Sequence, residues 1–384
     1  MLTTLHTLPV ELIYQILDHL DPIAILLSCR NVCTRLNRIT DNYQRYQTLT
    51  TLNLSYKRIG NQGAQRIATV LQQNKTVIAL YLQGNEIGVQ GIQDLTNSLK
   101  QNTTLTTLNL ESNGMGLQEA KYLGDILQIN KTISTLYLNN NKIGDEGVQY
   151  VANALQQNKT LTTLNLQNNG IGDSGMQYLA NALQQNQTLI RLYLENNRIG
   201  HVGAQYLANA LKKNKTLTAL YLSNNKIEQQ GTHYLTQGLQ ENEAVITLDL
   251  QRNQISDQGA RYLAKFLEGN KILNALYLQD NQIGAVGAQY LADALRQNQT
   301  LTILGVQNNR VGDSGADYFA DALKRNKTLI TLYLQNNDIS DRGGHYLTYG
   351  LQKNNTLTTL DVGNNRIKSD TQQLIRTLLE KYLQ

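Results

Sequence analysis

Hydrophobic positions recur along the chain with one fixed period. The pattern L-x-x-L-x-L-x-x-N, with Val or Ile allowed at its first position, begins at Leu49, Val77, Leu105, Ile133, Leu161, Leu189, Leu217, Val245, Leu273, Leu301, Leu329 and Leu357. All eleven spacings between these starts are 28 residues. A fixed period of this length is typical of solenoids, in which each unit buries its hydrophobic face against its neighbours. We therefore expect twelve structural repeats.

Each repeat predicts a short strand followed by a helix. Leu164-Asn165-Leu166 alternates with the period of a strand that buries one face. The segment 175–183, GMQYLANAL, places its apolar residues on one helical stripe. Asp or Ser often precedes the Gly at position 15, where we expect it to cap that helix. Strands joined by helices must be parallel, so the array should carry its sheet on the inner face and its helices outside.

Position 9 of the repeat is Asn in eleven of the twelve units. Such a ladder of buried amides can satisfy the backbone groups of each turn. The first unit departs with Lys57, and the last replaces the recurrent Gly with Thr371 and ends in LIRTLLEKYLQ. Atypical terminal units suit a solenoid, which has to cover its exposed core, and the final segment predicts a capping helix.

The repeats resemble the ribonuclease-inhibitor class of leucine-rich repeats. This resemblance implies an α/β fold: a horseshoe-shaped leucine-rich-repeat solenoid with a concave parallel sheet and outer helices. It covers residues 48–384, and residues 1–47, which do not follow the repeat, form a separate N-terminal helical domain in this interpretation.

Residues 8–39, LPVELIYQILDHLDPIAILLSCRNVCTRLNRI, have helical hydrophobic spacing. Asp21-Pro22 should end one helix and start another. The segment resembles an F-box, with Leu8-Pro9, Ile16-Leu17 and Val32-Cys33 in register with that family's motif and Leu36 where the family usually has Trp. The resemblance implies that a Skp-type adaptor of a cullin ubiquitin ligase binds here; the contact residues it implies are Leu8, Pro9, Leu12, Ile16 and Leu17. A plain helical cap on the first repeat is the alternative.

Residues that flank the strand leucines should point away from the core, onto the concave face. Position 5 alternates between Asn and Tyr over the first six repeats. Rigid, amphipathic Tyr side chains suit protein recognition, although the alternation could equally be a relic of duplication in pairs. Open-face residues that depart from the chain's own repeat consensus are further candidates for target binding, with neutral drift as the alternative. The predicted target-binding residues are Tyr81, Tyr137, Tyr193, Tyr221, Tyr277, Tyr333, Arg191, Glu195, Asp249 and Arg252.

Composition narrows the class of protein. A net charge of +5 on 384 residues does not favour nucleic acid, and no apolar stretch is long enough to span a membrane. Cys29 and Cys33 cannot form a disulfide framework, and the first residues lack a signal-peptide pattern. Nine Asn-x-Thr sequons share one position of the repeat, so we interpret them as turn chemistry copied by duplication and not as glycosylation sites.

Catalytic motifs are absent from the sequence. Its five histidines are far apart, and it contains no P-loop, GxSxG, HExxH or CxxC. We expect no enzyme activity, no cofactor and no metal.

We therefore predict that the protein is a substrate-recognition subunit of a Skp–cullin–F-box ligase and a monomer within that complex. The expected location is the cytoplasm, with the nucleus as an additional location in the alternative. A scaffold or inhibitor without an adaptor is the alternative, and a Ran-type GTPase activator is disfavoured because the chain lacks an acidic tail.

Overall fold

The structure, a computed structural model, describes residues 9–18 and 49–380. Two compact units, residues 1–169 and 170–384, make up the chain. Helix α1 (Val10–Asp18) is the described part of the first 47 residues. The predicted helix end at Asp21-Pro22 and the second amphipathic run lie outside the described residues, as does the predicted domain boundary after residue 47.

Unit 1 alternates strands and helices along a parallel sheet. Neighbouring strands pair with a shift of 28 residues, so that Leu52 lies opposite Leu80 and Leu80 opposite Leu108. Each of these strands has three residues. The elements are β1 (Thr51–Asn53), α5 (Gly60–Leu71), β2 (Ala79–Tyr81), α6 (Val89–Leu99), β3 (Thr107–Asn109), α7 (Leu117–Ile129), β4 (Thr135–Tyr137), α8 (Gly144–Gln157) and β5 (Thr163–Asn165).

Unit 2 continues the same plan over seven strands. Leu192 lies opposite Leu220 in the same register. The elements are α9 (Asp173–Leu183), β6 (Arg191–Tyr193), α10 (His201–Leu211), β7 (Ala219–Tyr221), α11 (Glu228–Gln240), β8 (Thr247–Asp249), α12 (Ser256–Gly269), β9 (Ala275–Tyr277), α13 (Ala285–Leu295), β10 (Ile303–Gly305), α14 (Gly312–Arg325), β11 (Thr331–Tyr333), α15 (Asp341–Leu351), β12 (Thr359–Asp361) and α16 (Ser369–Glu380).

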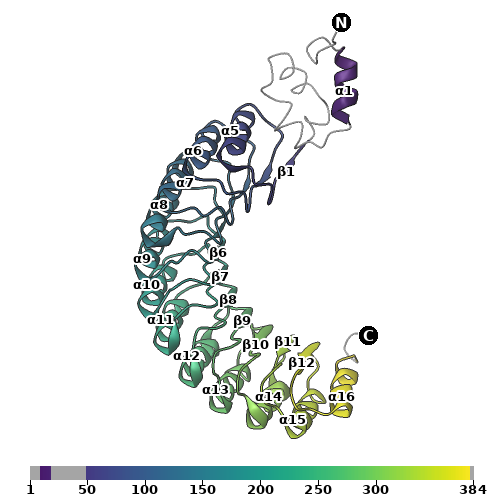
Figure 1. Cartoon of the computed structure of the whole chain (residues 1–384). Coiled ribbons are helices and arrows are strands. Elements are labelled where there is room, and N and C mark those ends of the chain that lie inside the picture. The colour runs from purple at the N-terminus through teal and green to yellow at the C-terminus, as the bar shows by residue number, and fades with distance from the viewer. Residues whose placement is uncertain (1–8, 19–48, 381–384) are drawn as a thin grey trace. The chain divides into compact units, whose positions relative to one another are not determined.

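Within each unit the helices cover one face of the sheet and leave the other uncovered (Figure 1). The strand leucines point toward the helices and are buried, as Leu220 and Leu276 show at 0% exposure. Helix residues such as Leu207 and Leu263 complete this core. The predicted twelve parallel strands of a leucine-rich-repeat solenoid are thus confirmed. We call the uncovered face, formed by repeat positions 3, 5 and 7, the open face.

The ladder of asparagines at position 9 is confirmed as a structural device. Asn281 is fully buried, and its side-chain NH2 donates to the carbonyls of Leu250 and Gln279 at 2.8 and 3.2 Å. Its Oδ1 accepts the backbone N–H groups of Asn253 and Ile255 at 2.8 and 3.3 Å. One amide therefore ties its own turn to the turn of the preceding repeat.

A second asparagine ladder runs at position 26, in the turn from helix to strand. Asn214, fully buried, donates to the carbonyls of Leu183 and Asn186, each at 2.9 Å, and accepts from the N–H of Leu217 at 2.8 Å. Nine of these asparagines, all except Asn242 and Asn270, are the first residues of the Asn-x-Thr sequons. Their role as turn chemistry is confirmed, because the amide nitrogen that glycosylation would require is buried and already bonded.

The aspartates near the helix starts bind differently from our expectation. Asp257 Oδ1 accepts the backbone N–H groups of Gly284 and Gly287 at 2.6 and 3.0 Å, and these belong to the next repeat. Asp173 and Asp313 make the equivalent bonds. The prediction that they cap their own helices was wrong: each aspartate neutralises the positive start of the following helix, because that start stacks directly beside it. Ser340 does cap its own helix, α15.

None of the helices in residues 9–18 and 49–380 has the length and apolar character to cross a membrane.

Candidate functional site

Helix α1 carries the described part of the predicted adaptor-binding segment. Leu12 and Ile16 are 43% and 44% exposed, while Ile13 is 2% exposed. Residues four apart lie on the same side of a helix, so Leu12 and Ile16 form one exposed apolar pair, and Pro9 next to it is exposed as well. Leu8 and the side chain of Leu17 lie outside the described residues. A paired apolar surface on a short helix is the kind of feature that a protein partner covers.

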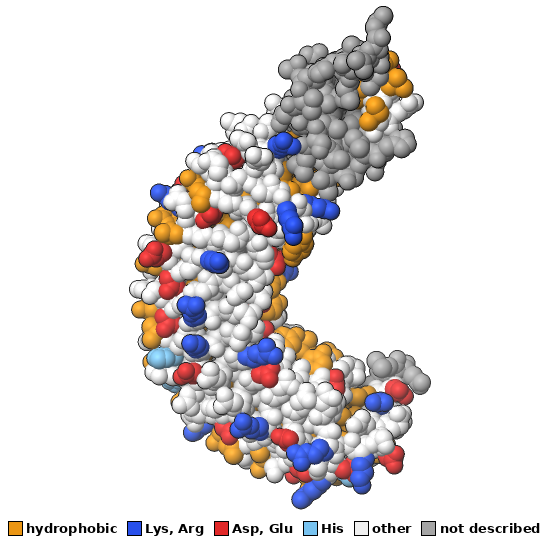
Figure 2. Space-filling model, viewed as in Figure 1, with side chains coloured by type: hydrophobic (Ala, Val, Ile, Leu, Met, Phe, Trp, Pro, Cys, Tyr) orange, Lys and Arg blue, Asp and Glu red, His pale blue; other side chains and the backbone are white. Residues whose placement is uncertain are grey.

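The open face of unit 2 brings several of the predicted target-binding residues together. Strand pairing sets Tyr193 beside Tyr221, Tyr221 beside Asp249, and Asp249 beside Tyr277. In the space-filling view, hydrophobic side chains, tyrosine included, gather on the strand side of this unit, whereas charged side chains of both signs are scattered over the flank (Figure 2). In unit 1, Tyr81 and Tyr137 lie on strands β2 and β4, separated by Asn109 of β3.

Tyr193 and Tyr221 form a stacked pair. Their ring centroids are 4.5 Å apart and the ring planes differ by 1°. Burial raises the pKa of both hydroxyls, and the nearby positive charge of Arg191 opposes this shift. Burial also raises the pKa of Tyr277, to which the charge of Asp249 contributes. These tyrosines are therefore neutral hydrogen-bonding groups over the whole physiological range.

Two carboxyl groups on the open face are largely removed from water. Burial raises the pKa of Glu195 to about 7, with a further contribution from the charge of Asp249, and its backbone hydrogen bond opposes the shift. Asp249 is only 7% exposed, and burial raises its pKa too, against the lowering effect of its hydrogen bonds to Gln251. Glu195 Oε2 is buried and has no hydrogen-bond partner among the described residues. A partner that supplies positive charge or N–H donors would therefore stabilise the ionised form of these acidic side chains.

Arg252 lies outside this group. It belongs to the loop after β8, its side chain is 64% exposed, and its Nε is 3.2 Å from Asp280 Oδ2 in the next repeat. An exposed pair of this kind adds little to stability and holds both charges at the rim of the face. We therefore see Arg252 as a neighbour of the candidate site and not as part of its centre.

Asn and Asp at position 5 have a role that the sequence pattern alone did not reveal. The side-chain oxygens of Asn53, Asn109, Asn165, Asp249 and Asp361 each accept the backbone N–H two residues further on, at 2.9 to 3.1 Å. Such Asx turns close the end of the strand. The Asn half of the Asn/Tyr alternation is explained by this turn. A tyrosine side chain is too long and rigid to close such a turn, so the Tyr half is not explained by it.

Gly305 interrupts the row of position-5 side chains between Tyr277 and Tyr333. Two glutamine side chains lean into the space: Gln307 Oε1 and Gln279 Oε1 lie 2.8 and 3.3 Å from the place where a Cβ of residue 305 would stand. Both oxygens are buried without a hydrogen-bond donor among the described residues. The two glutamine side chains and the ring of Tyr277 therefore fill the place that a position-5 side chain would take, and they leave two acceptor oxygens without donors.

Replacement of Glu195 by glutamine should stabilise the protein at alkaline pH. The folded state holds the Glu195 proton up to a pKa of about 7 and the unfolded chain only up to 4.5, so the free energy of unfolding falls as pH rises between these values. Because the side chain is partly solvated, we expect the substitution to raise the free energy of unfolding by only about 1 kcal/mol at about pH 8. This corresponds to roughly 2–4 °C in the unfolding temperature.

At pH 4.5 and below, this difference should vanish, because both states then hold the proton. The exposed Glu268 of α12 provides the control, since Glu268→Gln should have the same small effect at both pH values. Thermal unfolding followed by circular dichroism measures both variants. An equal effect of Glu195→Gln at acid and alkaline pH would contradict the assignment.

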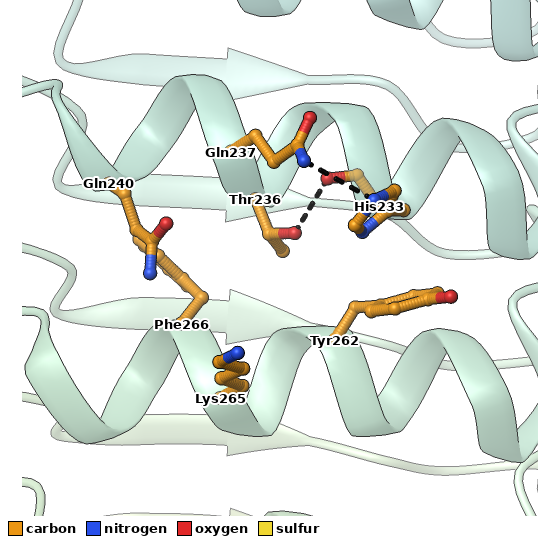
Figure 3. Close-up of a pocket in the computed structure, with 7 residues that line it drawn as sticks. All are labelled: His233, Thr236, Gln237, Gln240, Tyr262, Lys265 and Phe266. Carbon is orange, nitrogen blue, oxygen red and sulfur yellow. Dashed lines mark hydrogen bonds between the residues drawn. The ribbon is translucent and has the colours of Figure 1, made fainter.

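A pocket also lies on the helix side of unit 2 (Figure 3). It has a volume of about 160 Å³ and is lined by His233, Thr236, Gln237 and Gln240 of α11 and by Tyr262, Lys265 and Phe266 of α12. The rings of His233 and Tyr262 are 4.3 Å apart, and Gln237 hydrogen-bonds to His233 at 3.3 Å. Thr236 Oγ1 also donates to the backbone carbonyl of His233, at 2.8 Å, so two of the polar lining residues bond to His233. Within the described part of the chain, no group of three or more His, Cys, Asp or Glu side chains could hold a metal ion.

Two family models match the chain. The model described as Leucine Rich repeat matches eleven segments: residues 47–68, 101–118, 130–152, 157–180, 185–208, 213–231, 242–264, 269–292, 297–320, 325–347 and 353–370. The model described as F-box-like matches residues 5–50. Residues 69–100 lie outside the matched segments, although β2 and α6 give that stretch the same strand–helix plan.

Solved structures similar to the chain share its fold at low identity. The complex of Rad7 and Elc1 from yeast matches with a TM-score of 0.55 and 16% identity, over 97% of this chain and 84% of that chain. An internalin from Listeria monocytogenes gives 0.48 and 21%, over 83% and 92%. The actin-binding site 2 of leiomodin-1 gives 0.33 and 23%, over 39% and 88%. No curated protein sequence matches. The first of these likenesses supports the fold, and none of them carries function.

Proposed function

Because the chain belongs to the leucine-rich repeat family and has an F-box-like domain at residues 5–50 ahead of its repeats, we propose that it is the substrate-recognition subunit of a Skp–cullin–F-box ubiquitin ligase. The observation that carries this proposal is the presence of both modules on one chain. Both are non-catalytic interaction modules, so the chain would supply proximity between a target and the ligase, with the transfer chemistry elsewhere.

In this proposal the chain has two functional domains. Residues 1–47 bind the adaptor, and residues 48–384 bind the target protein on the open face. The exposed Leu12 and Ile16 of α1 support the first assignment, and the half-buried tyrosines on the open face of the sheet support the second. We further predict that each ligase complex contains one such chain. We also predict that the protein is located in the cytoplasm or the nucleus.

Simultaneous replacement of Leu12 and Ile16 by aspartate should weaken adaptor binding at least about tenfold. Two exposed apolar anchors at one interface each contribute on the order of 1–2 kcal/mol or more, and a charge in their place also has to be desolvated. Titration of a purified Skp-type adaptor into the full chain by calorimetry measures the loss. Glu11→Ala, on the same helix and also exposed, is the matched control and should bind like the unaltered chain.

If the unaltered chain does not bind a Skp-type adaptor, the proposed function fails. Affinity purification from cells with and without residues 1–47 then tests the alternative. Partners that are the same for both forms would show that the chain is a scaffold or inhibitor whose N-terminal helices only cap the solenoid. Adaptor and cullin that disappear on truncation support the ligase subunit.

A further inference from the structure

We propose that the open face of unit 2 receives a basic segment of the target protein, with lysine or arginine side chains directed at Glu195 and Asp249. That this segment belongs to a ligase target rests on the proposed function. The binding chemistry stands on the face itself and does not depend on the adaptor.

Charge on the open face is opposite in sign to the charge of the chain as a whole. In repeats 6 to 12, positions 3, 5 and 7 hold one basic residue, Arg191, and three acidic ones, Glu195, Asp249 and Asp361. The chain as a whole has a formal charge of +5. The positive excess therefore lies away from this face. A surface of this kind attracts basic partners and repels acidic proteins and nucleic acid.

Other acidic groups near the face already have partners. Asp280 pairs with Arg252 and Asp338 with Arg366, at 3.2 and 2.9 Å. Asp361 Oδ2 accepts a hydrogen bond from Gln335 at 2.5 Å. No ion pair involves Glu195 or Asp249, both of which lie in the described part of the chain. These two carboxyl groups are the ones left for an outside cation.

The carboxyl group of Asp249 is held in place before any partner arrives. The Asx turn fixes Asp249, whose Oδ1 accepts the N–H of Gln251 at 2.9 Å. Glu195 lies two residues beyond the end of β6 and is half-buried, with Oε2 out of contact with water and without a donor among the described residues. An ammonium or guanidinium group would supply the missing donors with little loss of side-chain freedom on the protein side, which is what makes a charge-assisted bond effective.

Tyrosine rings surround the carboxyl groups on the neighbouring strands. The stacked pair Tyr193 and Tyr221 lies on one side of Asp249, and Tyr277 lies on the other. Aromatic faces attract cations, and the apolar stems of lysine and arginine pack well against them. Beside Gly305, the side-chain oxygens of Gln279 and Gln307 have no donor among the described residues, and they suit N–H groups. Carboxylates, rings and amide oxygens therefore favour the same class of side chain.

The chain's own repeats provide variants that should not disturb the fold. Gln stands at position 7 in repeats such as those with Gln251 and Gln279, so Glu195→Gln restores a side chain that this place accepts. Asn stands at position 5 in Asn109 and Asn165, where it makes the same Asx turn as Asp249. The pair Glu195→Gln and Asp249→Asn therefore removes charge while keeping shape and backbone bonds.

The probe is a short peptide of alternating lysine and glycine that carries one tryptophan, with a glutamate–glycine peptide as its counterpart. The chain contains no Trp, so the tryptophan fluorescence of the peptide reports binding to the full-length protein directly. We expect the lysine peptide to bind, binding to weaken as salt is added, and the double variant to bind at least tenfold more weakly. Glu111→Gln, at position 7 of repeat 3 and bonded to Asn140 at 2.9 Å, is the matched control and should change binding less than twofold.

Equal binding of the two peptides, no binding of the lysine peptide, or unaltered binding by the double variant would overturn the inference. Leu12→Asp with Ile16→Asp should bind the lysine peptide like the unaltered chain. Loss of adaptor binding with peptide binding retained therefore separates the two proposals. A chain that binds the peptide but no adaptor keeps this inference and loses the ligase function, and the reverse result does the opposite.

Discussion

Replacing Asn281 by alanine is expected to lower the free energy of unfolding by about 3–5 kcal/mol. The substitution leaves the carbonyls of Leu250 and Gln279 without a donor and the N–H groups of Asn253 and Ile255 without an acceptor. A buried polar group that loses its partner costs about 1–3 kcal/mol, and the weaker bonds and any water that enters reduce the sum. Urea unfolding of the full chain, followed by circular dichroism, measures the change.

Asn355 is the matched control for Asn281. It is an exposed amide whose Oδ1 accepts from Lys327 at 3.2 Å, and Asn355→Ala should change stability by no more than about 0.5 kcal/mol. Asn281→Asp should be as damaging as alanine near neutral pH, because a carboxylate cannot donate to the two carbonyls. A free energy of unfolding for Asn281→Ala within about 1 kcal/mol of that of the unaltered chain, roughly the contribution of one hydrogen bond, would show that the ladder is not a main source of stability.

The sequence was sufficient to predict the fold because the fold has one period. A strand, a turn and a helix recur every 28 residues, so one correct assignment extends to twelve units. The buried leucines at positions such as Leu220 and Leu276 and the Asn ladder at position 9 follow directly from this pattern. The period also fixes the strand register, since Leu192, Leu220 and Leu248 each face the equivalent residue of the next repeat.

Contacts between repeats could not be predicted in the same way. A residue type at a fixed position does not show whether its side chain bonds within its own repeat or with the next one. Asp257 could therefore be placed near a helix start, but its bonds to Gly284 and Gly287, 27 and 30 residues away, appear only in three dimensions. The asparagines of the sequons are a similar case, since the sequence shows a modification motif where the structure shows a buried donor such as Asn214.

The sequence was sufficient to predict which face of the sheet carries the candidate site, but not the contacts and burial of its side chains. Alternation along the strand indicates that Tyr193 and Glu195 share the open face, because side chains two apart point the same way. It does not show that the rings of Tyr193 and Tyr221 stack, or that Glu195 Oε2 is buried without a partner. Departures from the repeat consensus at Arg191, Glu195 and Asp249 in nearby repeats are the signal from which these three residues were predicted.

Stability and recognition occupy different faces of the same repeat. Leucine and asparagine positions, which bond and pack between repeats, are nearly invariant within this chain, whereas positions 3, 5 and 7 of the open face vary. Glu195 illustrates the cost of that freedom, because its burial raises its pKa and makes the ionised form unfavourable in the folded chain. Such a residue is more readily explained by a partner that supplies the missing charge than by the fold.

Replacing Gly238 by alanine should destabilise the chain even though alanine favours helices. In the middle of a helix, this change gains about 1 kcal/mol from helix propensity. A Cβ at residue 238 of α11, however, would stand 2.4 Å from the carbonyl oxygen of Ala208 and 2.7 Å from its Cα, both backbone atoms of α10. The two helices would have to separate, and overpacking of this kind costs about 1–3 kcal/mol or more. We expect a net loss of about 1–2 kcal/mol.

Gly269, the last residue of α12, is the matched control because nothing lies within 4 Å of the place where its Cβ would stand. Gly269→Ala should keep the helix-propensity gain and stabilise the chain by up to about 1 kcal/mol. The same substitution at two glycines should therefore have opposite signs. Gly350 offers an independent repetition, since its Cβ would stand 2.6 Å from the carbonyl oxygen of Ala320. Urea unfolding together with hydrogen exchange of α10 and α11 measures the effect, and a stabilising Gly238→Ala would show that small residues do not set the spacing of these helices.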